Sequence, residues 1–113
     1  MKIYHNPKCS KSRQCLKLIK QNTSNFKIIL YLNNRLSVKE IKTLLSQLNI
    51  KIIELVRKEE KIWKEYYKQK KLTENEIIEI LSKYPKLIER PIIEHENVAI
   101  IGRPPENVLR FFT

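Results

Sequence analysis

The spacing of the apolar residues changes several times along this chain, and the order of these changes limits the folds that it can adopt. Residues 2–5 resemble a short strand that Asn6-Pro7 ends, a helical stripe follows at residues 15–19, and apolar residues alternate with a period of two from 26 to 32. The last run is apolar on both faces, which is typical of a strand in the middle of a sheet. Because crossovers between strands of one sheet are right-handed, the first third predicts a β-α-β unit with parallel strands.

The remainder of the chain predicts helices first and then a hairpin. Capping boxes at residues 37–40 and 73–76 begin two helices, and residues 51–69 have the apolar spacing of one or two more. Residues 92–93 and 98–101 predict two antiparallel strands joined by residues 94–97, and Pro104-Pro105-Glu106 begins a last helix. We therefore expect an α/β protein of thioredoxin-like fold, with the order β-α-β … β-β-α and a mixed four-stranded sheet. It would be one domain over residues 1–113, with a helical insertion at about residues 37–84.

The chain is strongly basic, with 23 Lys and Arg residues against 12 acidic ones and a formal net charge of +11. Most of the basic residues are Lys, in a chain also rich in Ile and Asn, so we interpret the surplus as a composition bias spread over the exposed faces. A nucleic-acid site would concentrate Arg and Lys in one stripe with aromatic residues between them. The one dense run, residues 61–71, holds Trp63, Tyr66 and Tyr67 on one face of a helix, which favours aromatics packed inward. We expect no nucleic-acid partner.

The apolar segments are too short for a membrane protein. None approaches the roughly 18 residues that span a bilayer, and residues 1–8 lack the apolar stretch of an export signal. We therefore expect a cytoplasmic protein with reduced thiols and no membrane partner. No apolar stripe is left over once the core is assigned, so we expect a monomer.

Cys9 is the first candidate for chemistry, because it directly follows the first strand and begins the first helix. A thiol at that place lies at the positive end of the helix dipole and near unpaired backbone N–H groups. His5, Lys8, Lys11 and Arg13 add positive charge within a few residues. We therefore expect the pKa of Cys9 to lie below its ordinary value and the thiolate to act as a nucleophile.

Cys15 is the second cysteine, and its spacing argues for a structural role. Six helical residues rise about 9 Å and turn the side chain away from Cys9, which is too far for a disulfide without unwinding the helix. Cys15 also shares an apolar stripe with Leu16 and Ile19. Since there is no Cys-x-x-Cys, an external thiol would have to release any adduct of Cys9.

Three arginines stand out in a chain that mostly uses Lys. Arg90 precedes Pro91 at the start of the third predicted strand, Arg103 follows Gly102 at the end of the fourth, and Arg57 lies in the helical region. Ends of neighbouring strands cluster in an open sheet, where the loop of Cys9 is also expected. Guanidinium groups bind tetrahedral oxyanions with two parallel hydrogen bonds. A thiolate beside several arginines predicts a nucleophile with an oxyanion substrate.

Five segments together resemble the glutaredoxin-dependent arsenate reductase family, within the arsenate reductase/Spx superfamily. They are Ile3-Tyr4-His5-Asn6-Pro7-Lys8-Cys9-Ser10-Lys11-Ser12-Arg13, Tyr31-Leu32, Leu55-Val56-Arg57-Lys58, Leu87-Ile88-Glu89-Arg90-Pro91-Ile92 and Ile101-Gly102-Arg103-Pro104-Pro105-Glu106. The last segment is similar to the YfgD-like branch. The resemblance implies a thioredoxin-like fold with a helical insertion and a cis peptide bond between Arg90 and Pro91.

The resemblance also implies roles for individual residues. The nucleophile matches Cys9, and the three oxyanion-binding arginines match Arg57, Arg90 and Arg103. His5 matches a histidine that helps to hold the thiolate, and Ser12 matches a serine that contacts the nucleophile. The implied reaction is reduction of arsenate to arsenite, with glutathione and glutaredoxin as co-substrates and with no bound metal or organic cofactor.

Two other functions stay open at this point. An Spx-like regulator shares the fold and binds RNA polymerase, but such proteins usually carry Cys-x-x-Cys where this chain has Cys9-Ser10-Lys11-Ser12. A general glutathione-linked thiol oxidoreductase would need Cys9 and His5 but neither Arg57 nor Arg103.

Overall fold

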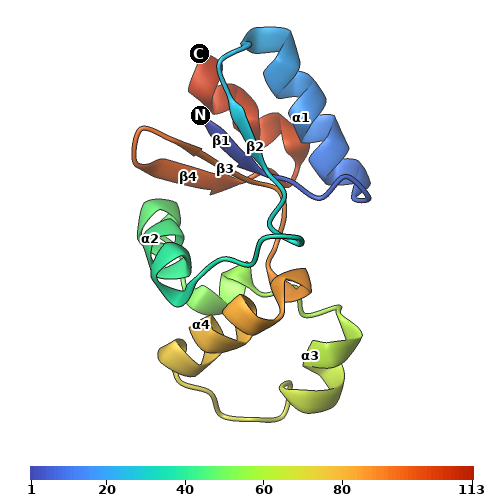
Figure 1. Cartoon of the computed structure of the whole chain (residues 1–113), viewed down its shortest axis with the longest axis vertical. Coiled ribbons are helices and arrows are strands. Elements are labelled where there is room, and N and C mark those ends of the chain that lie inside the picture. Colours follow the sequence, from blue (N-terminus) through green and yellow to red (C-terminus); the bar gives the residue numbers. More distant parts are fainter. The chain divides into compact units, whose positions relative to one another are not determined.

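The computed structural model describes residues 1–113, which group into two compact units. The first unit joins Met1–Asn33 to Arg90–Thr113, and the second is Asn34–Glu89 (Figure 1). The helical insertion expected at about residues 37–84 lies within the second unit. That both units form a single domain stays a prediction.

The first unit contains the predicted mixed sheet. Its strands are β1 (Lys2–Tyr4), β2 (Lys27–Ile29), β3 (Ile92–His95) and β4 (Val98–Ile101), in the spatial order β2-β1-β3-β4. β1 and β2 are parallel, whereas β3 is antiparallel to both β1 and β4. The sheet confirms the predicted β-α-β … β-β order, with helix α1 (Ser10–Asn22) between the first two strands.

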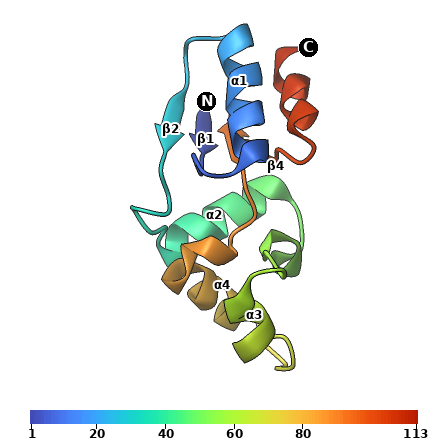
Figure 2. The ribbon, with the colours of Figure 1, turned by 90° about the vertical axis from the view of Figure 1, so that its right-hand side faces the viewer.

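One hydrophobic cluster of this unit lies on one face of the sheet. Ile3, Ile93 and Ile100 are register partners across β1, β3 and β4, and they form one buried row. Helix α1 and the C-terminal 3₁₀ helix η3 (Pro105–Phe112) lie side by side over that row (Figure 2). Each large aliphatic side chain buried there stabilises the fold by roughly 1.5–3 kcal/mol.

The last element, η3, is a 3₁₀ helix, whereas the sequence predicted an ordinary α-helix there.

The position of β2 corrects one prediction. The run of apolar residues from 26 to 32 predicted a central strand, but β2 is three residues long and lies at the edge of the sheet. The side chains of Ile28 and Leu30 remain 39% and 38% exposed. Apolar residues on both faces were therefore not a sign of coverage on both faces.

The second unit is helical and begins its helices where the sequence predicts. It contains α2 (Val38–Leu48), α3 (Lys61–Tyr66), α4 (Glu74–Lys83) and the 3₁₀ turns η1 (Ile52–Leu55) and η2 (Pro85–Leu87). Ser37 and Thr73 both complete the predicted capping boxes, with side-chain and backbone hydrogen bonds of 2.9–3.1 Å. Asn49 ends α2 in the left-handed conformation, at φ 54°.

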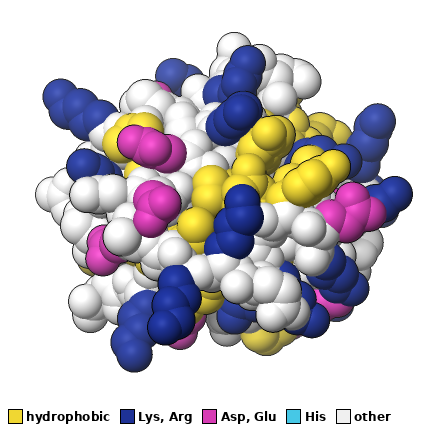
Figure 3. Space-filling view, turned by 90° about the horizontal axis from the view of Figure 1, so that it is seen from below, with side chains coloured by type: hydrophobic (Ala, Val, Ile, Leu, Met, Phe, Trp, Pro, Cys, Tyr) yellow, Lys and Arg dark blue, Asp and Glu magenta, His cyan; other side chains and the backbone are white.

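The aromatic run of this unit is only partly packed inward. Trp63 is buried, and the Tyr67 ring contacts the rings of both Trp63 and Tyr84 at tilted angles, but Tyr66 is 61% exposed. Helix α3 ends at Tyr66, so the three aromatic residues do not share one continuous helical face as predicted. In the view from below, basic side chains are scattered among carboxylates and a strip of hydrophobic atoms (Figure 3).

No helix of the molecule is both long enough and apolar enough to cross a membrane.

Candidate active site

Cys9 is the N-cap residue of α1, at the end of the loop that leaves β1. Its backbone N–H donates to the carbonyl oxygen of Asn6 at 3.0 Å, and its own carbonyl accepts from the N–H of Arg13 at 3.0 Å. The thiol is only partly exposed. The loop and the first helical turn thus hold the sulfur at the mouth of the helix, where the sequence placed it.

The loop before Cys9 is fixed by two further hydrogen bonds. The side-chain oxygen of Asn6 accepts from the backbone N–H of Lys8 at 3.0 Å, and the Arg13 guanidinium donates to the carbonyl of Pro7 at 2.9 Å. The residue pattern predicted Asn6-Pro7 as the end of a strand and gave the Asn6 side chain no part in the turn. The Asn side chain, which often bonds to the backbone two residues on, was the signal for its part in shaping this turn.

Several positive groups surround the sulfur and favour its ionised form. Partial burial opposes ionisation, but backbone hydrogen bonds from Ser12 and Lys11, a hydrogen bond from Arg90 and the charge of Arg103 together outweigh it. The pKa of Cys9 is therefore lowered from its ordinary value. The helix N-terminus and the arginines both contribute, as expected for a reactive cysteine.

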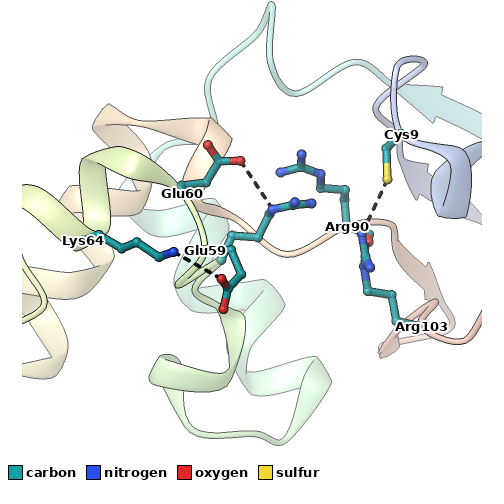
Figure 4. A network of polar contacts seen from close by, with 7 residues as sticks. Cys9, Glu59, Glu60, Lys64, Arg90 and Arg103 are labelled. Carbon is teal, nitrogen blue, oxygen red and sulfur yellow. Dashed lines mark hydrogen bonds and ion pairs between the residues drawn. The ribbon is translucent and has the colours of Figure 1, made fainter.

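Arg103 makes a direct side-chain contact with the thiol. Its Nη2 donates to Cys9 Sγ at 3.6 Å, while its Nε donates to the carbonyl oxygen of Arg90 at 2.9 Å (Figure 4). The second bond holds the guanidinium in place, so Nε binds the backbone while Nη2 donates to the sulfur. The structure thus brings together Cys9, Arg90 and Arg103, which are far apart in the sequence.

The backbone around the two arginines is unusual at two peptide bonds. The Arg90–Pro91 bond is cis, which confirms the expectation, and the Arg103–Pro104 bond is also cis, which the sequence did not predict. The N–H of Gly102 donates to the carbonyl of Pro91 at 2.8 Å, which connects the two segments.

Gly102, the only glycine of the chain, is required by close packing. A Cβ atom there would lie 2.9 Å from both Cys15 Sγ and Pro91 Cγ and 3.0 Å from Ile93 Cδ1. Cys15 is fully buried beneath this position, and burial raises its pKa to about 12. These facts confirm that Cys15 is a core residue, and its sulfur is un-ionised at neutral pH.

His5 and Ser12 form a buried pair next to the loop. His5 Nδ1 lies 2.6 Å from Ser12 Oγ, which also accepts from the backbone N–H of Asn6 at 3.1 Å. Burial, followed by the charges of Lys20 and Arg13, lowers the pKa of His5, so its ring is neutral at pH 7. The contacts of both side chains support the loop, and their expected roles toward the thiolate stay predictions.

Arg57 belongs to the second unit. It follows an isolated antiparallel bridge between Val56 and Ile88, and its N–H donates to the carbonyl of Leu87 at 2.7 Å. Its Nε lies 3.4 Å from a carboxylate oxygen of Glu60. A role for Arg57 in binding an oxyanion stays a prediction.

A partly exposed cysteine with a lowered pKa, at the start of the first helix of a mixed four-stranded sheet, defines a protein of thioredoxin-like fold with one candidate active-site cysteine. The chain belongs to the ArsC family, whose model matches residues 4–111. It is 41% identical over 111 residues to the uncharacterised protein YfgD of Escherichia coli K12, covering 96% of this chain and 93% of that protein.

Two further relatives carry the name arsenate reductase. The one from Haemophilus influenzae is 38% identical over 109 residues, covering 95% of this chain and 94% of the relative. A solved structure of arsenate reductase from Vibrio cholerae superimposes with a TM-score of 0.92 at 39% identity, covering 97% of each chain. The similarity therefore extends over nearly the whole length of this chain and of each of these two relatives.

Proposed function

We propose that this protein reduces arsenate to arsenite, with the Cys9 thiolate as nucleophile and glutathione and glutaredoxin as external reductants in the cytoplasm. The observation that carries the proposal is the 3.6 Å contact between the Arg103 guanidinium and Cys9 Sγ, in a chain similar to named arsenate reductases. A cation at that distance both stabilises a thiolate and binds an oxygen of an incoming oxyanion.

In the first step, the Cys9 thiolate attacks the arsenic of arsenate. A sulfur–arsenic bond forms, and one oxygen of arsenate leaves as water after protonation, so arsenic remains As(V). Arg103 and Arg90 neutralise the remaining oxygens, and Arg57 is expected to add a third guanidinium. No bound metal or organic cofactor is needed for this step.

In the second step, a glutathione thiolate attacks the sulfur of Cys9. A disulfide forms between Cys9 and glutathione, and the sulfur–arsenic bond breaks with its electron pair on arsenic, which leaves as arsenite, As(III). Two thiols are thereby oxidised by two electrons in all. A glutaredoxin thiolate then attacks the glutathione sulfur, and Cys9 leaves as a thiolate, for which its lowered pKa makes it a good leaving group.

The test is coupled NADPH oxidation with arsenate, glutathione, glutaredoxin and glutathione reductase. Cys9→Ser should abolish arsenate-dependent oxidation, whereas Cys15→Ser, at the buried thiol, should keep most of it. Arg103→Ala should lower kcat/KM for arsenate about ten- to a hundred-fold, the range of a lost charge-assisted contact, and Arg110→Ala on the exposed side of η3 is its control.

Other outcomes would reject the proposal. Wild-type protein that reduces small disulfides but not arsenate, with no effect of Arg103→Ala, would instead identify a general thiol oxidoreductase. Co-purification with RNA polymerase in the absence of arsenate turnover would favour a regulator.

A further inference from the structure

The basic surplus of the chain is concentrated beside the candidate nucleophile. Residues 1–33 contain seven Lys and Arg residues and no Asp or Glu. Residues 34–89 contain thirteen Lys and Arg residues together with nine Glu residues. The composition suggested an even spread of the surplus basic residues over the exposed faces, and this distribution along the chain contradicts that interpretation. Helix α1 and the residues before and after it, up to residue 33, therefore carry charged side chains of one sign only.

The helix geometry aligns part of this charge with Cys9. Arg13, Leu16 and Lys20 follow Cys9 by four, seven and eleven residues, so at about 100° per residue they lie within about 40° of its direction. Lys17 lies beside them. At a rise of about 1.5 Å per residue, the stripe runs roughly 16 Å from the sulfur along the helix.

The side chains of this stripe are available at the surface. Arg13, Lys17 and Lys20 are exposed, Leu16 is half-buried, and no carboxylate forms an ion pair with any of the three cations. Together with His5 and Pro7 they line a surface hollow with a largely apolar floor and a cationic rim. We call Pro7, Arg13, Leu16, Lys17 and Lys20 the α1 basic face.

We propose that the α1 basic face is the docking surface for an acidic, protein-sized dithiol reductant that regenerates Cys9. This inference rests on the proposed function, since it names the surface that receives the last reactant. The redox step is thiol–disulfide exchange. The partner's thiolate attacks the glutathione sulfur of the Cys9 mixed disulfide, a partner–glutathione disulfide forms, and Cys9 leaves as a thiolate.

The length and chemistry of the face favour a protein over other anions. Charges spread over roughly 16 Å of helix extend beyond what one tripeptide bridges while its sulfur remains at Cys9. The face has no aromatic side chain on which bases could stack, which single-stranded nucleic acids need. An apolar patch formed by Pro7 and Leu16, rimmed by cations, is instead suited to a small acidic protein surface.

The physical effect expected of such a face is on the rate of encounter. Exposed ion pairs contribute only about 0.2–1 kcal/mol each, but a field of one sign raises association rates by roughly 10–10³-fold at low ionic strength. Reduction by the partner should therefore be fast at low salt and should slow as salt screens the charges.

The experiment starts from full-length protein whose Cys9 has been converted to the mixed disulfide with oxidised glutathione. Its reduction is followed in single-turnover mode with three probes: a glutaredoxin of acidic isoelectric point, glutathione alone and dithiothreitol. The variant is Lys17→Glu/Lys20→Glu, and the matched control is Lys39→Glu/Lys42→Glu, which reverses two exposed lysines at the same spacing on α2. Measurement at about pH 8 keeps His5 neutral in all proteins.

With glutaredoxin at low salt, we expect the mixed disulfide of the α1 variant to be reduced at least about tenfold more slowly than that of wild type. The difference between the two rates should shrink at high salt. The control variant should react like wild type, and dithiothreitol should reduce all three proteins equally. Since no arsenate is present, this result is independent of whether the protein turns arsenate over. Melting temperatures of the three proteins check that the variants are folded.

Three outcomes would overturn the proposal. If glutaredoxin reduced the α1 variant as fast as the α2 control variant, the α1 basic face would not be the surface that receives the partner. If the α1 variant lost as much rate with glutathione alone as with glutaredoxin, the charges of the face would instead bind a small thiol that carries carboxylates. A lost affinity for a single-stranded oligonucleotide with unchanged reduction rates would identify a nucleic-acid surface.

Discussion

At Cys9, the charge state of one sulfur depends on a few nearby donors and not on the total charge of the molecule. Backbone N–H groups of the first helical turn and the two arginines counteract the cost of partial burial. Cys15, in the same helix, lacks these donors and has a raised pKa. The identity of the residue therefore decides less than its position relative to the helix terminus.

His5 should make the stability of the fold depend on pH. Its pKa is lowered in the folded state by burial and by Lys20 and Arg13, so the unfolded chain binds the proton more readily. The contribution is complete above the unfolded pKa of about 6.5 and is lost as pH falls below it, with a slope of at most about 1.4 kcal/mol per pH unit.

Urea unfolding at about pH 7.5 and about pH 5.5 measures this effect. Wild type should lose more stability between the two pH values than His5→Gln, in which the titrating group is absent. Parallel losses in wild type and His5→Gln would show that His5 titrates alike in both states.

The residues of the site were predictable to different degrees. The position of Cys9 followed from the strand-to-helix change around it, and the cis bond before Pro91 followed from the family resemblance. The 3.6 Å contact of Arg103 did not follow from the sequence, because it depends on a backbone bond to Arg90 that no local pattern encodes.

Among the elements, β4 and the segment after it position Arg103, and Gly102 is the residue on which their packing depends. Gly102→Ala should destabilise the protein by about 1–3 kcal/mol, the usual cost of overpacking, because the new methyl group would contact Cys15 Sγ and Pro91 Cγ at 2.9 Å. Urea unfolding measures the loss.

A double-mutant cycle with Cys15→Ala tests this cause. Removing the sulfur relieves one of the two closest contacts, so the double variant should be more stable than the sum of the single effects predicts. Strictly additive effects would show that the methyl group is accommodated elsewhere.

Elements with strong local signals were predicted well, and those that depend on tertiary context were not. The capping boxes at Ser37 and Thr73 begin α2 and α4 as expected, because their hydrogen bonds lie within four residues. The edge position of β2 and the exposure of Tyr66 were missed. Burial of an apolar side chain depends on which neighbour covers it, and the spacing of residues does not contain that information.

For the whole molecule, the net charge of +11 should make the fold more stable in moderate salt. Like charges repel one another more in the compact state, and salt screens this repulsion over about 10 Å at 0.1 M. The melting temperature should therefore rise between about 20 and about 300 mM sodium chloride. Lys17→Glu/Lys20→Glu, with less charge to screen, should show a smaller rise, and a falling melting temperature in wild type would contradict the argument.

The sealed position of Cys15 beneath Gly102 has a practical use. A maleimide dye added to the native protein will attach to a single sulfur, so fluorescence or spin-label studies can begin from the unaltered polypeptide. The dye occupies the reactive position itself, and its signal therefore reports directly on what approaches it.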